Sequence, residues 1–497
     1  MLNGGKMVSF IIQKEKTCIL KIFILVILFF GINIYMSFAT DTYSTFSMGF
    51  RAAAWDMFIR NGRPVVALLY ALYYISGLPN LYFYYISTIL ALLFLGVSIW
   101  MFQKILEKYG IKENIRIVLS FISIANIFII EYFMFIEKSG FMLAILLNIV
   151  GIYLINLFFE QGVKKYYIFS IIAIIFAIFT YQGTIALFAI LSVPFAFKRA
   201  KDFGDYFLKI LAIGVAYGIP IVIDIVTLKM VFKSARIAEK VDYISNAKNL
   251  LSGLAYNSTM TFDVLPKYFF QIIILVVLLA TIILIIINRA NILFGIINLL
   301  VIVSAAFILS AASIFQGSGW WAMRVVYPMA SVVGALAINL YMNYRMAESS
   351  KARSLAKRMV TFAIGFLLTI QYFSFNRIYI DKYKLNALDE YRYNYIGQAI
   401  DDYQENTGIE IKKIAFYSDA EKIYPPYPNL YCQGDLVVSA FYTDWSDIKA
   451  LNYYLGGNYE KIDPLDEYVT YFAERNWDRL SSNQLLFEKD TLHICIY

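Results

Sequence analysis

The sequence has 497 residues, 60% of them hydrophobic and 16% charged, with a formal net charge of +8 and a mean hydropathy of +0.64. A soluble globular chain carries roughly 45–50% apolar and about 25% charged residues, so a cytosolic enzyme, a secreted disulfide scaffold and a disordered chain are excluded. Three cysteines and one histidine argue against a cysteine–histidine metal cluster and against histidine-centred catalysis. The composition indicates a polytopic membrane protein.

Apolar stretches of about 20 residues, the length of a helix that crosses the bilayer core, recur along the chain. The first is too long for a signal peptide and no small-residue cleavage site follows it, so we expect a span. We predict eleven spans, at about 19–39, 81–103, 117–133, 141–159, 167–179, 184–197, 207–228, 268–287, 292–314, 325–343 and 359–375. The segment 64–79 is apolar but shorter, and we expect a re-entrant or membrane-surface helix there.

Lysine and arginine concentrate in alternate segments between the predicted spans, for example in 1–18, 104–116 and 345–358. This bias is typical of cytoplasmic segments, so we predict a cytoplasmic N-terminus. Eleven crossings then place the C-terminus outside, and the expected location is the inner (cytoplasmic) membrane, as a multi-pass protein. The basic excess follows from this orientation, and a nucleic-acid partner is not implied.

The composition changes near residue 376, after which acidic residues outnumber basic ones. We therefore predict a membrane domain at 1–375 and a small extracytoplasmic α/β domain at 376–497, which is large enough to bury its own core. The pattern predicts helices over 381–405 and 444–455, the second ending at Gly456-Gly457, and strands over 411–417 and 491–497. Cys432 and Cys495 lie in this domain, either as a disulfide or as two buried thiols.

The first outer segment, 40–80, carries polar residues at the membrane boundary, where ionisable groups mark function because they are costly to keep near the bilayer core. An apolar stripe predicts a helix lying on the membrane and comprises Phe46, Phe50, Ala53, Ala54 and Met57. Asp56 and Arg60 are spaced to form an ion pair on this helix. Gly62 and Pro64 are typical of a helix end followed by a new helix start.

Three outer carboxylates are candidate catalytic residues. Asp41 follows the first span, where a rigid helix end fixes a half-desolvated carboxylate, as a general base requires. The alternative is that Asp41 only caps the next helix. Asp56 has a stronger alternative, as half of a solvated ion pair. Glu137 begins the turn Glu137-Lys138-Ser139-Gly140, which we expect to connect two spans on the outer side.

Two further outer turns carry candidate substrate-binding residues. Tyr181 and Gln182 interrupt a long apolar stretch, where Asn-Gly would suffice for a simple turn. Trp320 and Trp321 suit either stacking on a sugar or the membrane interface. Arg324 either binds a lipid phosphate through two N–H groups or extends toward the interface to reach water.

The order of these elements resembles that of a known enzyme family. An N-terminal span that ends in an outer aspartate is followed by a surface helix, an Asn-Gly-Arg-Pro element and a Tyr-Gln hairpin. This order is similar to that of the serotype-converting glucosyltransferases of the Gtr type II family, which belong to the membrane glycosyltransferases with the GT-C fold. The resemblance implies a mainly α, polytopic bundle of about 11 spans, followed by the small outer domain.

The resemblance also implies an activity. The family moves a sugar, here glucose, from a polyprenyl-phosphate carrier to a cell-surface polysaccharide or glycolipid, such as O-antigen, on the outer membrane face. It implies that Asp41 is the catalytic carboxylate and that Arg51, Arg63 and Arg324 steady the lipid phosphate. The chain has no Walker loop or glycine-rich nucleotide fingerprint, and it lacks the paired acidic motif of metal-dependent members. We therefore predict no cofactor, and no residue pattern in the sequence indicates a metal site.

Two other functions stay open at this point. A polysaccharide polymerase or ligase would rely on a large arginine-rich outer loop, whereas the longest internal outer loop, 229–267, is mixed in charge. A transporter or lipid flippase would need ionisable groups along a path through the bilayer. The few candidates for such a path are Glu131, Asp224, Lys229 and Gln271.

Overall fold

The computed structural model describes residues 2–232, 244–245, 248–249, 251–253, 255, 261–287, 292–309, 322–343, 351–417, 427, 429–431, 437–473, 477 and 480–495. The chain divides into two compact units. The first unit comprises Met1–Ile34, Ala54–Phe133 and Glu137–Asn376. The second comprises Tyr35–Ala53, Met134–Ile136 and Arg377–Tyr497.

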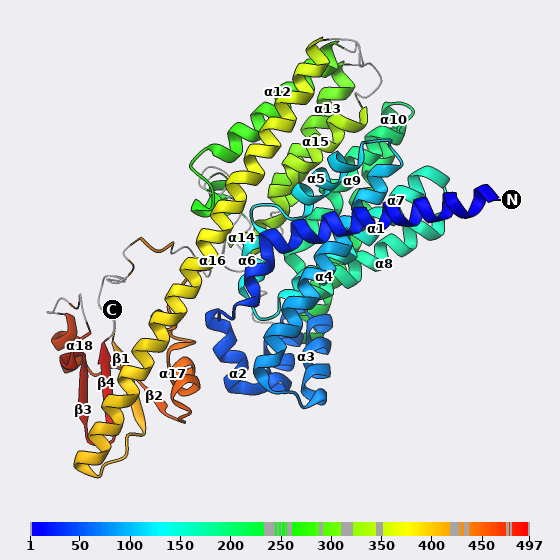
Figure 1. Ribbon diagram of the computed structural model, residues 1–497. Helices are drawn as coiled ribbons and strands as arrows, with labels where there is room; N and C mark the ends of the chain where they lie inside the picture. The colour runs from blue at the N-terminus through cyan, green and yellow to red at the C-terminus, as the bar shows by residue number, and fades with distance from the viewer. Residues whose placement is uncertain are drawn as a thin grey trace. The chain divides into compact units, whose positions relative to one another are not determined.

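The first unit is helical. Its helices are α1 (Leu2–Phe30), α3 (Pro64–Ser76), α4 (Asn80–Glu107), α5 (Glu113–Ile124), α6 (Ile129–Met134), α7 (Lys138–Gln161), α8 (Lys164–Thr180), α9 (Ala186–Arg199), α10 (Phe203–Thr227), α12 (Phe269–Ile287), α13 (Ile292–Ser304), α14 (Met323–Val326), α15 (Val332–Asn343) and the start of α16 (Lys351–Thr407) (Figure 1). Short 3₁₀ turns are η1 (Gly31–Ile34), η3 (Ile59–Asn61), η4 (Gln182–Thr184), η6 (Thr261–Asp263) and η9 (Tyr327–Ser331), and wider π turns are η2 (Ala54–Phe58), η5 (Leu228–Phe232) and η7 (Ala305–Leu309).

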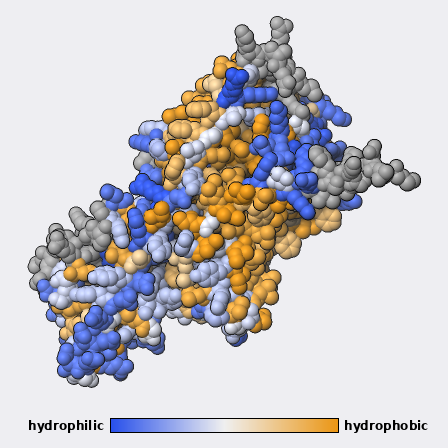
Figure 2. Space-filling view, in the orientation of Figure 1, coloured by the Kyte–Doolittle hydropathy of each residue, from blue (hydrophilic) through white to orange (hydrophobic). Residues whose placement is uncertain are grey.

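Eight helices in the described part of the chain are long and apolar enough to cross a membrane. They are Gln13–Ile34, Asn80–Glu107, Lys138–Gln161, Phe203–Phe232, Phe269–Ile287, Ile292–Leu309, Met323–Met342 and Ser354–Thr407. Large apolar side chains such as Ile89 and Phe207 are more than half exposed, and Figure 2 shows hydrophobic residues over much of the visible face of the helical unit. Such a surface is stable in lipid rather than in water, so the architecture is that of a multi-pass membrane protein.

The predicted count of eleven spans is not confirmed, because three of the predicted segments form shorter helices. The segment 117–133 is divided into α5 and α6, since the helix breaks at Ala125 (φ −89°, ψ 52°). The segments 167–179 and 184–197 form α8, with 17 residues, and α9, with 14. A helix of 14 residues is about 21 Å long, which is less than the ~30 Å hydrocarbon core. The segment 64–79 forms the 13-residue helix α3.

Small and polar residues set the closest helix contacts of this unit. A Cβ atom on Gly151 of α7 would lie 2.6 Å from Cδ1 of Ile174 of α8, and Ser170 of α8 donates to the Gly151 carbonyl at 2.9 Å. On η9, Ser331 donates to the Ser123 carbonyl of α5 at 2.7 Å and accepts from Asn126 at 2.9 Å. Membrane helices, which gain little from apolar burial against each other, commonly associate in this way.

The second unit is a small α/β fold. It contains the end of α16, β1 (Lys413–Tyr417), α17 (Asp447–Leu455), β2 (Glu460–Ile462), α18 (Asp466–Ala473), β3 (Leu485–Glu488) and β4 (Thr491–Cys495). The strand order is β2-β1-β4-β3, with β1 parallel to both neighbours and β3 antiparallel to β4 (Figure 1). The predicted helix 444–455 and strand 411–417 are confirmed as α17 and β1, and α17 ends at Gly456 in the left-handed conformation (φ 62°). The predicted strand 491–497 is confirmed as β4 as far as Cys495, the last described residue. The predicted helix 381–405 is not a separate element but the C-terminal part of α16, which continues without a break from the predicted span 359–375. Cys495 is buried in β4, whereas Cys432 lies outside the described residues.

Helix α2 (Thr40–Ala53) also belongs to the second unit, although more than 320 residues separate it in sequence from Arg377, where the C-terminal part of that unit begins. It packs against α17, where the hydroxyl groups of Tyr43 and Tyr454 lie 3.0 Å apart. Lys449 of α17 donates to the Ser44 hydroxyl at 3.1 Å. The composition of the segment 40–80 gave no sign of this partner, because its apolar stripe suits a protein surface as well as a membrane surface.

Candidate functional site

The Asn-Gly-Arg-Pro element forms a tight link between η3 and α3. Gly62 adopts a left-handed conformation (φ 74°) and ends η3, and Pro64 is the first residue of α3, as the sequence predicts. A Cβ atom on Gly62 would lie 2.8 Å from Leu228 and 2.9 Å from Nε2 of Gln182. Only glycine allows this backbone to approach so closely, and the approach fixes Arg63 beside Gln182.

Gln182 connects this element to two other segments of the first unit. Its Nε2 atom donates to the Asn61 carbonyl at 3.1 Å and to the Gly62 carbonyl at 3.2 Å, and it lies 3.5 Å from Oδ1 of Asp224. Its Oε1 atom accepts from Nε of Arg63 at 3.3 Å. The side chain therefore uses both its donor and its acceptor, which explains why a glutamine occupies a turn that Asn-Gly could make.

Tyr181 provides an aromatic platform under the arginine. The Arg63 guanidinium carbon lies 4.6 Å from the centre of the Tyr181 ring, within the range of a cation–π contact. The ring is buried and packs edge-on against Phe141, with 4.6 Å between centroids, and against Tyr132, with 5.5 Å. Among the described residues, neither Nη atom of Arg63 has a hydrogen-bond or ion-pair partner, so these N–H groups are available to a ligand.

Asp224 brings a carboxylate to the same place. It lies near the end of the Phe203–Phe232 span and is 6% exposed. Arg63 is close enough to interact with it electrostatically, in addition to the Gln182 contact. A carboxylate inside a membrane helix is stable only where such partners compensate it. From the sequence, Asp224 was predicted only as a candidate for a transporter path. Its position as a lone charge in an apolar span was the signal that could have identified it as a site residue. We call Arg63, Tyr181, Gln182 and Asp224 the Arg63 cluster.

A second arginine adjoins the Arg63 cluster. Arg324 of α14 forms an ion pair with Glu131 of α6, and its backbone N–H donates to Glu131 at 2.5 Å. A Cβ atom on Gly183 would lie 2.6 Å from the Arg324 carbonyl oxygen, so the Tyr181–Gly183 turn touches this residue. The side chains of Arg324 and Glu131 are only 13% and 2% exposed. Arg324 therefore does not extend toward water, and a buried carboxylate neutralises it.

The three predicted catalytic carboxylates have different surroundings. Asp41 is the second residue of α2, in the second unit, and is partly exposed; a carboxylate there is stabilised by the positive end of the helix dipole. Asp56 forms the predicted ion pair with Arg60, 3.2 Å apart and about half exposed, which matches its alternative interpretation. Glu137 precedes α7 at the N-cap position and is 8% exposed, so the turn that it begins is buried rather than exposed.

The remaining predicted binding residues lie elsewhere. Arg51 is exposed in the last turn of α2, in the second unit. Trp320 and Trp321, like most of the loop 229–267, lie outside the described residues. Among the described residues, no group of three or more histidine, cysteine, aspartate or glutamate side chains is placed to hold a metal ion. The structure thus unites Arg63, Tyr181, Gln182 and Arg324 in one unit.

Comparison with known proteins gives no assignment for these residues. No family model matches the chain, and no curated protein matches it. The physical properties of the Arg63 cluster are therefore the basis for a functional interpretation. The cluster combines a cation with open donors, an aromatic platform and a buried carboxylate, and the carboxylate lies near the end of the span Phe203–Phe232.

Proposed function

We propose that this chain is a membrane glycosyltransferase of the GT-C type, which transfers a sugar, taken here as glucose, from a polyprenyl-phosphate carrier to a cell-surface polysaccharide such as O-antigen. The observation that supports the proposal is the Arg63 cluster. A lipid-linked donor is already activated through its phosphate, so the protein needs an anion-binding group at the membrane and no nucleotide pocket. Arg63 offers free N–H groups for that purpose.

The proposed reaction assigns a role to each charged group. The acceptor hydroxyl oxygen bonds to the anomeric carbon, the bond from that carbon to the phosphate oxygen breaks, and the polyprenyl phosphate leaves with the electron pair. Arg63 stabilises the charge that grows on the leaving phosphate. A carboxylate accepts the hydroxyl proton. Asp41 is the proposed base from the resemblance, and Asp224 is the alternative because of its place beside Arg63.

We further propose an orientation of the chain in the membrane. The N-terminus lies in the cytoplasm, the chain resides in the inner membrane, and α8, α9 and the α5–α6 pair complete eleven crossings together with the eight long helices. The second unit then lies outside the cell. Its aromatic residues, such as the exposed Trp445, suit the binding of an acceptor glycan.

The test replaces one of two nearby arginines. The variants Arg63→Gln and Arg60→Gln are placed in vesicles that contain polyprenyl-phosphate-linked labelled glucose, and the label in polysaccharide is measured. We expect Arg63→Gln to lower kcat/KM by about 100-fold, the order found when a charge-stabilising donor is removed, and Arg60→Gln to change it less than about twofold. Equal activity of the two variants would exclude Arg63 from phosphate binding.

The buried carboxylates favour one second candidate, a flippase for the lipid-linked sugar. Asp224 and Glu131 are both nearly inaccessible within the helical unit, as ionisable groups along a transport path would be. In the same vesicles, movement of labelled lipid across the bilayer without label in polysaccharide would identify a flippase.

A second pair of variants identifies the catalytic base of the proposed transferase. Loss of transfer in Asp41→Asn but not in Asp224→Asn would assign the base to Asp41, and the reverse result would assign it to Asp224.

A further inference from the structure

A charged cavity lies between α1, α4 and α5, away from the Arg63 cluster in sequence. It has a volume of about 260 Å³ and is lined by Lys14, Glu15, Cys18, Lys104, Glu107, Glu113 and Arg116. Cavities that take drug-sized ligands hold roughly 300–1,000 Å³, so this one suits a smaller group. All of its lining residues belong to the first unit, and they lie at the polar ends of apolar helices.

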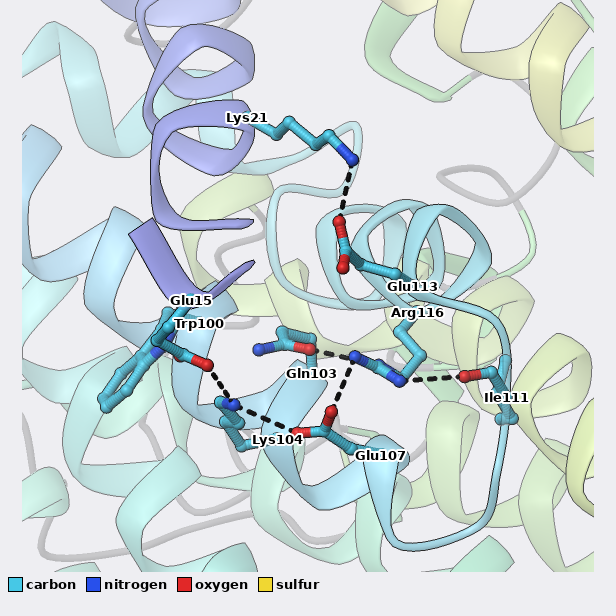
Figure 3. Close-up of polar contacts among 9 residues, drawn as sticks. All are labelled: Glu15, Lys21, Trp100, Gln103, Lys104, Glu107, Ile111, Glu113 and Arg116. Atoms are coloured by element: carbon cyan, nitrogen blue, oxygen red, sulfur yellow. Dashed lines mark hydrogen bonds and ion pairs between the residues drawn. The ribbon is translucent and has the colours of Figure 1, made fainter. Parts of the chain in front are cut away.

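One side of the cavity is a network of ion pairs and hydrogen bonds (Figure 3). Lys104 pairs with Glu15 and, at 3.0 Å, with Glu107. Glu107 also pairs with Arg116 at 3.1 Å, and Arg116 donates to Gln103 at 3.1 Å. These contacts join α1, α4 and α5 to one another. The cavity between the three helices is therefore present without a ligand.

The other side of the cavity has unused charges. Among the described residues, Lys14 has no hydrogen-bond or ion-pair partner although it lines the cavity. Glu113 pairs with Lys21 at 2.7 Å through one carboxylate oxygen (Figure 3), and within the described part of the chain its other oxygen has no hydrogen-bond or ion-pair partner. The space therefore presents one available ammonium group and one available carboxylate oxygen.

The charges of the lining select the kind of ligand. Three basic residues are balanced by three glutamates. A purely anionic ligand would be repelled by the three glutamates, and a purely cationic ligand would be repelled by the three basic residues. A group that carries both signs avoids either repulsion and satisfies both open partners.

The surface next to the cavity indicates where such a ligand comes from. On α1, the exposed Lys21 is followed by Ile24 and Leu28, which are 57% and 54% exposed. These apolar side chains face lipid in a membrane-spanning helix, so a lipid beside them has its headgroup at the level of the lysines.

We propose that this cavity binds the headgroup of a zwitterionic aminophospholipid. The phosphate binds Lys14, the ammonium group folds back toward the bilayer to reach Glu113, and the acyl chains run from the phosphate along Ile24 and Leu28. The site is independent of glycosyl transfer, and its failure or success leaves the proposed function untouched. The alternative is that the cluster only fastens α1 to α4 and α5.

Native mass spectrometry of the full-length chain in detergent tests this site. Phosphatidylethanolamine and phosphatidylglycerol with identical acyl chains are added in turn, and the bound fraction is measured. We expect one phosphatidylethanolamine to bind at least about tenfold more tightly than phosphatidylglycerol. The change Lys14→Gln lowers this affinity about tenfold, whereas Lys16→Gln, at an exposed neighbouring position that does not line the cavity, leaves it unchanged.

A second variant separates binding from folding. Glu113→Gln removes the partner of the ammonium group and one repulsive charge, so it weakens phosphatidylethanolamine binding and strengthens phosphatidylglycerol binding. An unfolded variant would lose both lipids. Equal affinity of the wild type for the two lipids, or unchanged binding in Lys14→Gln, would overturn the proposal and leave the cluster as a helix fastening.

Discussion

The side chain of Gln182 illustrates how one residue organises the candidate site. It donates to two backbone carbonyl groups and accepts from Arg63. Replacement of Gln182 by glutamate would therefore remove the hydrogen-bond donor, and replacement by leucine would remove both the donor and the acceptor. A buried polar group left without its partner costs about 1–3 kcal/mol. The sequence identified this glutamine as unusual for a turn, but its four partners come from segments more than 40 residues away and could not be predicted from spacing.

Gly62 allows a direct test of this close packing. In Gly62→Ala, the left-handed backbone costs about 1–2 kcal/mol and the new methyl group also collides with Leu228 and Gln182. Gly77 has a similar φ of 66° but nothing within 4 Å of its virtual Cβ. We expect thermal unfolding in detergent to show a larger fall in Tm for Gly62→Ala than for Gly77→Ala. Equal falls would mean that the site tolerates the methyl group.

We expect His493 of β4 to make the second unit less stable in acid. Burial lowers the pKa of its imidazole below the ordinary value of about 6.5, with Tyr417 hydrogen-bonded to Nδ1 at 2.9 Å. Below pH 6.5 the unfolded chain therefore binds more protons than the folded one, and this contribution to stability is lost as the pH falls toward the lowered pKa.

We expect hydrogen exchange of Thr491–Cys495, corrected for its intrinsic pH dependence, to show less protection at pH 5.5 than at pH 7.5. The variant His493→Gln removes the titrating group and reduces this difference, while other ionisable groups contribute equally to both proteins. An undiminished difference in the variant would show that another group is responsible.

The packing of α7 against α8 depends on a small residue, Gly151, which lets the two helix axes approach each other closely. In Gly151→Ala, the new methyl group meets Cδ1 of Ile174, an atom that valine lacks. We expect Gly151→Ala to lower the free energy of unfolding by about 1–3 kcal/mol, as overpacking does, and the pair Gly151→Ala with Ile174→Val to recover part of it. A double-mutant cycle of thermal unfolding measures the coupling, and additive changes would contradict the contact.

At the scale of elements, the sequence predicted the helices, strands and helix ends that depend on a local residue pattern. The long apolar spans, the end of α17 at Gly456 and the strands β1 and β4 follow from hydropathy, glycine and alternation. The break at Ala125 was not predicted, because no proline or glycine marks it. Asn126 stabilises it instead, by donating to the Tyr327 carbonyl at 3.0 Å from a distant part of the chain.

At the scale of the whole molecule, the proposed topology is open to chemical labelling. In a Cys432→Ser chain the two remaining cysteines, Cys18 and Cys495, are buried. We expect an added Glu405→Cys, exposed in α16, to react with an impermeant maleimide in intact cells, and an added Lys112→Cys to react only after lysis. The reverse pattern would invert the orientation and place the second unit in the cytoplasm.

Each arginine of this site has a carboxylate nearby, which has a consequence for ligand capture. Arg63 interacts electrostatically with Asp224 without a direct ion pair, and Arg324 forms an ion pair with Glu131, so the opposite charges offset one another and produce little field at a distance. The proposed lipid-linked donor is then not drawn in from a distance, and we expect it to reach the arginines by lateral diffusion along the bilayer. We expect its rate of association to be almost independent of ionic strength, unlike that of an enzyme that attracts its substrate through an excess of one charge.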